Sequence, residues 1–362
     1  MNMKTTKRLL AAGLVLAMLC AFTACHKKNE IAVTVGEEEF TSAYYMCALI
    51  NADSEAKSKV QETLTDEEKQ ATDIDYYSKK VEDKSFVKWV EETALENLKK
   101  IAAYKALCKE NKLEISEEDR NNAETYADYY WNNYGYSSYF EPNGVGQATY
   151  KKYMLDSNYA ATYFEHIYGA EGTKAIAADA LKTKMLENFQ LADKLDVTFS
   201  EETDEQKAAM KTKLDGYVEA LQKGSMTYEQ VYKDHNGTTE EADTAKTEGS
   251  DDPKPQDSYA ELIGTEDTSY ASDYYETVKN MAVGEVKLVE KEEGAGYVLL
   301  VKKDLSADAY YLTQLDLTLR HLIADDDFDK EIEAYANKLK TTVNDYAVKQ
   351  FKVKKIKTPS AS

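Results

Sequence analysis

The sequence has few of the features that define several large protein classes. It holds four cysteines and four histidines in 362 residues, and nothing in their spacing looks like a zinc site or a dense disulfide framework. No two histidines lie close together with a third orienting group, so the sequence indicates no histidine-based catalytic site. We therefore expect no catalytic residues, no metal ligands and no cofactor.

Basic charge is also scarce. The chain has 66 acidic and 45 basic residues, a net charge of −21, and no basic stripe interleaved with aromatic residues. A surface this negative repels phosphate backbones, which excludes nucleic acid as an expected partner. With 43% hydrophobic and 31% charged residues, the composition is typical of a folded globular chain.

The sequence contains one strongly apolar run, Leu9 to Phe22, which follows Lys4, Lys7 and Arg8 and is too short to span a membrane comfortably. This pattern is typical of a secretory signal peptide. The run ends in Phe22-Thr23-Ala24-Cys25, which resembles the lipobox at which bacterial lipoproteins are cleaved and acylated. We therefore expect residues 1–24 to be a signal peptide, Cys25 to be lipidated, and the protein to lie on the extracytoplasmic face of a cell membrane.

Removal of the signal and lipidation of Cys25 leave Cys47 and Cys108 in the folded part. An extracytoplasmic location permits a disulfide between them. Both lie on apolar faces of predicted helices, where a free cysteine acts as a small hydrophobic residue, and the pattern favours two buried thiols.

Periodicity divides the mature chain into regions of different character. After a polar tether at 25–30, residues 31–191 contain a short first strand and then mostly helical patterns, including a long core helix from Ser85 to Lys109. Residues 192–305 show a β-α-α-loop-α-β-β pattern, with a predicted helix from Tyr270 to Met281. The tail at 306–362 is too short to fold alone and is expected to pack on the helical region. The predicted fold class is α+β, with 192–305 inserted into a mostly helical domain.

Within the tail we expect a strand-like piece near Tyr310, a helix from Phe328 to about Tyr346 and a closing strand from Phe351 to Ile356. The acidic run at 325–331 resembles part of a calcium loop, but the glycine that such a loop needs is absent and Lys330 interrupts it. We interpret it as the acidic first turn of the helix.

The order of four motifs resembles the PrsA/SurA-type extracytoplasmic foldases, whose inserted domain is a parvulin-type (PpiC-like) peptidyl-prolyl isomerase. The motifs are VGEEEFTSAYY (35–45), KENKLEISEED (109–119), YVEALQKGSMTYEQV (217–231) and MAVGEV with GYVLLVK (281–302). The resemblance covers most of the mature chain. It implies a SurA-N-like helical chaperone domain, a parvulin-like domain, and exported folding polypeptides as partners.

The chain departs from the family at the residues that carry its chemistry. Two strand-borne histidines are typical of active parvulins, and the matching positions here are Asp196 and Val298. A third polar element would fall near His235. The resemblance implies a proline-binding helix at Tyr270, Tyr274 and Met281, although ordinary core packing would explain the same residues. Isomerase activity is therefore open, and we expect it to be weak or lost.

Tyrosine is abundant, with 28 residues in clusters that include 126–139. Tyrosine offers a large amphipathic contact area with little rotamer entropy to lose, which suits a surface that holds unfolded chains. Core packing is the alternative for this cluster. The sequence thus predicts a lipid-anchored foldase or chaperone. The alternatives are a competent isomerase with a rearranged site and a non-catalytic ligand-binding surface lipoprotein.

Overall fold

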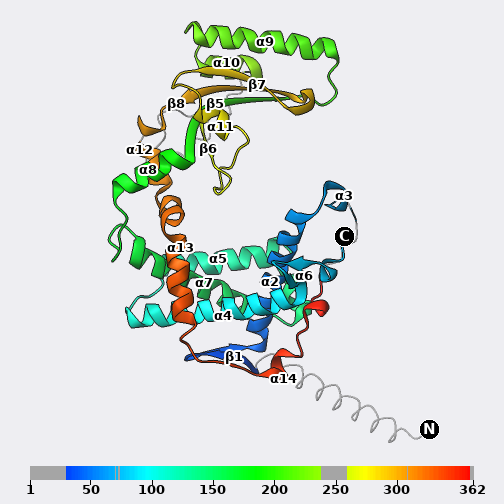
Figure 1. The fold of residues 1–362 in the computed structure, drawn as a ribbon, viewed down its shortest axis with the longest axis vertical. Helices are drawn as coiled ribbons and strands as arrows, with labels where there is room; N and C mark the ends of the chain where they lie inside the picture. Colours follow the sequence, from blue (N-terminus) through cyan, green and yellow to red (C-terminus); the bar gives the residue numbers. More distant parts are fainter. Residues whose placement is uncertain (1–29, 70, 72–73, 238–258, 308, 359–362) are drawn as a thin grey trace, which may run out of the picture. The chain divides into compact units, whose positions relative to one another are not determined.

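The computed structural model describes residues 30–69, 71, 74–237, 259–307 and 309–358. Within this part the chain forms two compact units (Figure 1). Unit 1 contains the described residues up to Ala175 and from Asp326 onward, and unit 2 contains Ile176–Asp325. The fold is α+β, as predicted. The expected signal peptide and Cys25 lie outside the described residues.

Unit 1 is a group of packed helices with a small sheet. The antiparallel sheet has the order β2-β1-β9, so strands from the two ends of the chain pair directly, with Val33 opposite Val343. A two-stranded ribbon lies between α3 and α4. The elements of unit 1 are β1 Ile31–Val35, β2 Glu38–Thr41, α2 Ser42–Thr63, α3 Asp66–Lys69, β3 Lys80–Val81, β4 Lys84–Ser85, α4 Phe86–Glu110, α5 Glu117–Asn133, α6 Tyr136–Phe140, α7 Gln147–Tyr168, the second half of α13 Asp316–Ala336, β9 Thr341–Val343 and α14 Asp345–Val348.

The long helix α4 confirms the predicted core helix. Its buried positions recur at helical spacing, as in Phe86, Val90 and Leu98, and they pack in one hydrophobic cluster with α2 and with the C-terminal residues Val353 and Ile356. The next helix, α5, begins after the N-cap residue Ser116, whose Oγ accepts a hydrogen bond from the Asp119 amide at 3.0 Å. Local signals therefore fix where these helices lie.

Unit 2 is built on a four-stranded antiparallel sheet with the order β6-β5-β8-β7. Helices α9 and α10 pack on one face through Leu195 and Leu299, and α11 packs on the other through Val298 and Leu300 (Figure 1). Both α9 and α10 begin with a capping box, at Thr203 and at Thr227. The elements of unit 2 are α8 Ala178–Asn188, β5 Phe189–Thr198, α9 Asp204–Gln222, α10 Tyr228–Asn236, β6 Ala260–Gly264, α11 Tyr275–Lys279, β7 Val286–Glu290, β8 Gly296–Lys303, α12 Ala309–Gln314 and the first half of α13.

Unit 2 is longer at both ends than the predicted insertion at 192–305. Helix α8 and the start of β5 share a hydrophobic cluster with α12 and the first half of α13, where Leu181, Phe189, Leu315 and Leu319 are buried together. Residues 306–325 therefore pack within unit 2, and only the part of the tail from Asp326 onward packs within unit 1.

Several predicted elements in the second half of the chain are wrong. The helix predicted for 270–281 is limited to α11, Tyr275–Lys279, and a strand that the sequence analysis missed, β6, precedes it. The strand-like piece near Tyr310 is the helix α12. The helix predicted for 328–346 is α13, which begins at Asp316, so the acidic run at 325–331 lies inside the helix rather than in its first turn.

The closing strand predicted for Phe351 to Ile356 is also wrong. This segment contains a 3-10 turn, Val353–Lys355, and its buried residues Val353 and Ile356 lie three apart, which is the spacing of such a turn rather than of a strand.

Cys47 and Cys108 are buried free thiols in the structure. Burial raises the pKa of both thiols, that of Cys108 to about 11.

Candidate functional site

The two positions that match the family's histidines lie directly opposite each other. Asp196 on β5 pairs with Val298 on β8 in the antiparallel register. Val298 is fully buried in the cluster under α11, whereas Asp196 is exposed and forms an ion pair with Lys291, which also donates to the Thr198 hydroxyl. The paired positions thus hold an ion-paired carboxylate and an apolar side chain, and neither is an imidazole.

The three predicted proline-binding residues do not share one helix. Tyr270 lies in the loop before α11, is 41% exposed and has its ring 5.9 Å from that of Phe189. Tyr274 is the half-buried N-cap residue of α11, and Met281 is buried just beyond the end of that helix. Tyr274 and Met281 pack in the same hydrophobic cluster as Val298. The structure therefore brings Tyr274 and Met281 together on the α11 face of the sheet, with Tyr270 outside that cluster.

His235, near which the resemblance implies a third polar group, lies on the same cavity as Asp196, which the sequence alone could not show. Both residues line one cavity of about 630 Å³ at the end of β5, with Phe199, Met210 and Lys213. The His235 Nδ1 is buried and has no hydrogen-bond partner among the described residues. Burial lowers the pKa of His235, and the charge of Lys213 lowers it further, so this imidazole is neutral at pH 7. The other described histidines, His166 and His321, lie outside this cavity.

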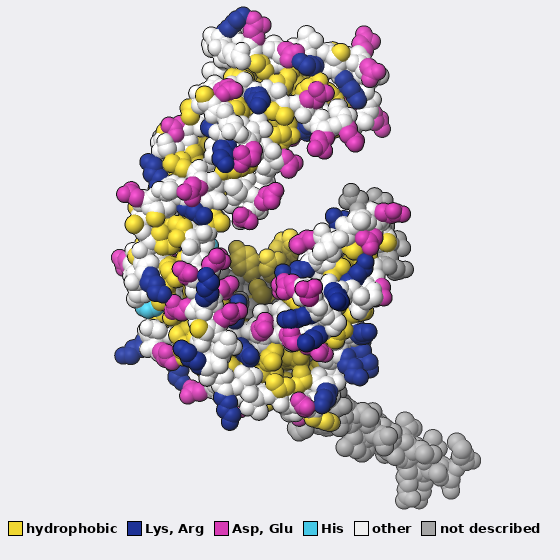
Figure 2. Space-filling view, viewed as in Figure 1, with side chains coloured by type: hydrophobic (Ala, Val, Ile, Leu, Met, Phe, Trp, Pro, Cys, Tyr) yellow, Lys and Arg dark blue, Asp and Glu magenta, His cyan; other side chains and the backbone are white. Residues whose placement is uncertain are grey.

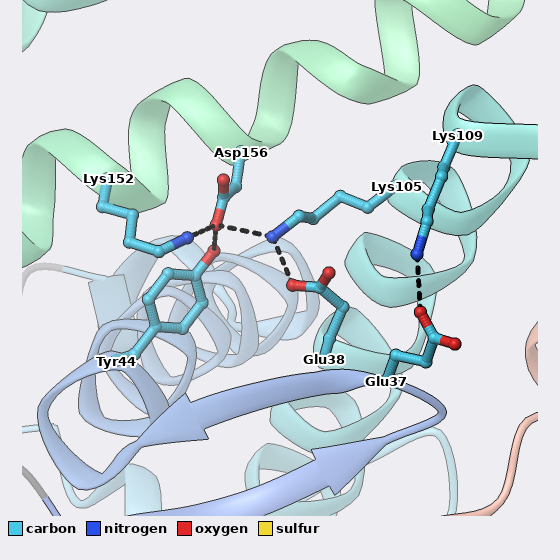
Figure 3. A network of polar contacts seen from close by, with 7 residues as sticks. All are labelled: Glu37, Glu38, Tyr44, Lys105, Lys109, Lys152 and Asp156. Atoms are coloured by element: carbon cyan, nitrogen blue, oxygen red, sulfur yellow. Dashed lines mark hydrogen bonds and ion pairs between the residues drawn. The ribbon is translucent and has the colours of Figure 1, made fainter. Parts of the chain in front are cut away.

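In unit 1 a network of charged side chains joins three helices to the β1–β2 turn (Figure 3). Asp156 on α7 is buried, accepts a hydrogen bond from the Tyr44 hydroxyl at 2.9 Å and forms ion pairs with Lys152 and Lys105. Lys105 also pairs with Glu38. Burial and the Asp156 charge raise the pKa of Tyr44 far above its usual range, so the hydroxyl remains a donor. Because each charge in this network has a partner, we interpret it as a scaffold that fixes α7 against α2 and α4.

On this scaffold, α5 and α6 carry a group of tyrosines that we call the tyrosine surface: Tyr126, Tyr129, Tyr130, Tyr134 and Tyr136. Four of them are between 37% and 62% exposed, and Tyr130 is half-buried. Their rings touch one another, with the Tyr130 and Tyr136 rings stacked at 5.5 Å and the Tyr129 and Tyr134 rings edge to face at 5.4 Å. Hydrophobic side chains, tyrosine among them, gather over this part of unit 1 in Figure 2.

The chain around four of these rings, from Tyr129 to Tyr136, carries no charge, whereas Asp128 lies between Tyr126 and Tyr129. No Asp, Glu, Lys or Arg occurs from residue 129 to residue 140, in a chain of which 31% is charged. Below the surface, Trp131, Phe140 and Tyr150 are buried and hold α5 and α6 against α7. Core packing therefore accounts for the buried members of this cluster, and for the exposed ones a contact surface stays a prediction.

Sequence reasoning missed one concave site, a groove of about 820 Å³ in unit 1. Its apolar lining comes from β1, α4 and the segment after β9, and includes Val33, Val87, Leu95 and Phe351. Val33 and Phe351 are more than 300 residues apart along the chain, and no local sequence pattern connects them. Only the pairing of β1 with β9 brings them together.

Comparison with known proteins gives structural neighbours and no sequence relatives. No family model matches the chain. No curated protein matches it either. The crystal structure of the foldase protein PrsA from Streptococcus pneumoniae aligns with a TM-score of 0.39 and 13% identity, over 71% of this chain and 87% of that one. PrsA from Bacillus subtilis aligns with a TM-score of 0.26 and 13% identity, over 74% of this chain and 89% of that one. Neither structure assigns a role to a residue of this chain.

Proposed function

We propose that this protein is a lipid-anchored extracytoplasmic foldase that holds exported polypeptides through the tyrosine surface of unit 1. The observation that carries the proposal is a contiguous, uncharged group of exposed aromatic rings on an acidic protein. A folded chain that need not bind anything has no reason to keep four tyrosines exposed and in mutual contact. Such rings offer apolar faces and hydroxyl groups that tolerate many client sequences.

The acidic remainder of the protein fits the same role. A net charge of −21 keeps a chaperone soluble while it holds a hydrophobic client. No helix among the described residues is long and apolar enough to cross a membrane. In this proposal acyl chains on Cys25, which follows the lipobox-like Phe22-Thr23-Ala24, attach the protein to the membrane.

In this proposal unit 2 is a parvulin-like domain that binds extended segments and has little isomerase activity. Prolyl isomerisation needs an apolar clamp for the ring and polar groups that stabilise the twisted amide. The α11 face supplies apolar side chains at Tyr274, Met281 and Val298, but its polar element is Asp196, which is already paired with Lys291. Of these side chains only Tyr274 is partly exposed, because Met281 and Val298 are buried, and no histidine stands at Asp196 or Val298. We therefore propose that this face binds extended segments without efficient isomerisation.

The test compares two tyrosines of equal exposure in unit 1. The chain from residue 26 onward, which contains every described residue, is assayed for suppression of light scattering by a denatured exported protein. Tyr134→Ser should weaken suppression, and the double variant Tyr129→Ser with Tyr134→Ser should raise the concentration needed for half-suppression roughly tenfold, since each aromatic contact is worth about 0.5–1.5 kcal/mol. The control is Tyr346→Ser, because Tyr346 is 66% exposed but lies on α14, outside the tyrosine surface.

If Tyr346→Ser weakens the suppression of aggregation as much as the tyrosine-surface variants do, the assignment of the client site is refuted. Wild-type protein that suppresses no aggregation would refute the foldase proposal itself. Circular dichroism of each variant checks that unit 1 remains folded.

A competent isomerase with a rearranged site is the second candidate, and the cavity shared by Asp196 and His235 favours it. This cavity combines a neutral imidazole, a carboxylate and the apolar side chains of Phe199 and Met210. A protease-coupled prolyl peptide assay tests it with the same protein. Isomerase activity that His235→Ala abolishes would establish this candidate, whereas no acceleration by the wild-type protein would refute it.

A further inference from the structure

The last part of unit 1 carries a concentration of positive charge that the foldase proposal does not use. We call residues 349–357 the basic segment, and its lysines are Lys349, Lys352, Lys354, Lys355 and Lys357. No Asp or Glu occurs from residue 346 to the last residue, although the whole chain has a net charge of −21. Lys and Arg side chains gather on the side of unit 1 in Figure 2 where Figure 1 draws this segment in red.

The segment is fixed to the body of unit 1 and is not a loose tail. Val353 and Ile356 are buried in the main hydrophobic cluster. The Asn143 side chain donates to the Lys357 carbonyl at 2.9 Å and accepts from the Lys357 amide at 2.8 Å. All five lysines are exposed. Burial of the apolar positions therefore displays the lysines on one short, ordered stretch of surface.

Most of this charge is not neutralised within unit 1. Lys349 pairs with Asp345 at 3.0 Å, and the Lys354 ammonium lies 5.9 Å from the centre of the Tyr77 ring. Lys352, Lys355 and Lys357 form no ion pair with any residue that the structure describes. At least three cations are thus available to an external anion.

The basic segment lies beside the point where the described chain begins. The Asn344 side chain donates to Glu30 Oε1 at 3.2 Å and to the Ile31 carbonyl at 3.1 Å, and the Asn344 amide donates to the Ala32 carbonyl. Helix α14 and then Lys349 follow directly. Glu30 lies five positions after Cys25, and a chain of that length spans at most about 18 Å. A lipid on Cys25 would therefore keep this face of unit 1 close to the membrane.

The groove of unit 1 opens on the same face. Lys349, Lys352 and Lys354 line it together with apolar side chains such as Val348 and Phe351. Its acidic residues are Glu91, Glu92 and Asp345, of which Glu92 pairs with Lys84 and Lys88. With Lys88, the groove has four lysines against three carboxylates. Its lysines beside an apolar lining are complementary to an amphiphile with an anionic headgroup.

We propose that the basic segment docks unit 1 on the anionic phospholipid headgroups of the membrane that carries the lipid anchor. The rest of the protein is acidic and repelled by such a surface, so this segment fixes which face of unit 1 meets the membrane. The attraction acts only within about one Debye length, roughly 8–10 Å at physiological salt, and the short tether from Cys25 provides that proximity.

The test uses the chain from residue 26 onward, so that binding depends on the segment and not on the acyl chains. Co-sedimentation is measured with vesicles of phosphatidylglycerol and phosphatidylcholine, and with vesicles of phosphatidylcholine alone. The protein should bind the vesicles that contain phosphatidylglycerol, and this binding should fall steeply as salt increases. Replacing Lys352, Lys354, Lys355 and Lys357 by Gln should weaken binding at least 30-fold, because each lysine near an anionic surface strengthens binding roughly fivefold.

The matched control removes four exposed lysines of unit 2, by Lys182→Gln, Lys223→Gln, Lys279→Gln and Lys287→Gln. It changes net charge equally and should bind as the wild type does. Equal weakening by both variants, or no binding of the wild type to anionic vesicles, would overturn the proposal. Binding to soluble poly(glycerol phosphate) without binding to vesicles would overturn it in favour of an anionic polymer. None of these outcomes depends on client binding, so this proposal and the foldase proposal fail separately.

Discussion

Gly296, at the start of the closing strand β8, allows a sharp test of how unit 2 is held together. Its φ is +148°, a backbone conformation that residues with a side chain rarely adopt. A Cβ there would lie 2.0 Å from the Val197 carbonyl oxygen on β5. That oxygen belongs to the backbone of a paired strand and cannot turn aside. Gly296→Ala must therefore separate β5 from β8 or distort both.

The expected loss follows from two costs. A residue held in a sparsely populated backbone region costs about 1–3 kcal/mol, and forcing an extra methyl into a packed site costs about 1–3 kcal/mol more. The sum, roughly 3–4 kcal/mol, is a large part of the 5–15 kcal/mol that stabilises a typical domain. With a urea m-value near 1.5 kcal/mol/M, the unfolding midpoint of unit 2 should fall by about 2 M.

The assay can separate the two units because the chain has only two tryptophans, Trp89 and Trp131, and both lie in unit 1. Tryptophan fluorescence during urea unfolding therefore follows unit 1, while far-ultraviolet circular dichroism follows both units. Gly296→Ala should shift a transition seen by circular dichroism and leave the fluorescence transition in place.

The control is Gly294→Ala, two residues earlier. Gly294 also has a positive φ, +70°, but a Cβ there meets no atom within 4 Å. The left-handed conformation costs roughly 1–2 kcal/mol for alanine, and the smaller entropy of its unfolded chain returns about 0.4–1 kcal/mol. Midpoints for the two variants that agree within about 0.5 M would refute the argument from close approach.

Two predictions concern unit 1, both followed by tryptophan fluorescence. Asp156→Ala should lower its free energy of unfolding by about 2–3 kcal/mol, because the buried Tyr44 hydroxyl loses its acceptor and Lys105 and Lys152 lose an ion-pair partner, although Lys105 keeps its pair with Glu38. Tyr44→Phe should cost only about 1 kcal/mol, and equal losses would contradict the network. Burial raises the pKa of Asp53, although the Lys57 Nζ lies 2.6 Å away, so Asp53 stabilises the fold fully only below its unfolded pKa and less as pH rises through its folded pKa. Asp53→Asn should therefore stabilise unit 1 at pH 7 more than at pH 3, and a difference from wild type that is independent of pH would refute this.

Elements set by local signals could be predicted from the sequence. The apolar spacing of the predicted core helix from Ser85 to Lys109 placed α4 correctly, to within one residue at each end. The missed strand β6 is short, and only its register with β5 defines it. The predicted helix at 270–281 failed because the tyrosines before Tyr275 lie in a loop fixed by the Thr268 hydroxyl and by the backbone of Gly264.

The candidate sites show the same division. The sequence identified the tyrosines at 126–139, because composition carries that information. The match of Asp196 and Val298 to parvulin histidines stays a prediction from the order of motifs. The sequence could not show which tyrosines are exposed. It also could not place Asp196 and His235 on one cavity, since that contact depends on how α10 packs against the end of β5.

The pairing of β1 with β9 has a consequence for the order in which the protein folds if it is exported as proposed. Val33 and Val343 are neighbours in the sheet but 310 positions apart along the chain. If the N-terminus crosses the membrane first, β1 emerges long before β9, and until then one edge of β1 has no partner strand. Unit 2 has its own core and is made in between, so its folding shortens the loop that must close and lowers the entropic cost of bringing the two ends together. Unit 1 would then be the last part of the molecule to mature, and a chain cut short before β9 would be released with its first strand exposed.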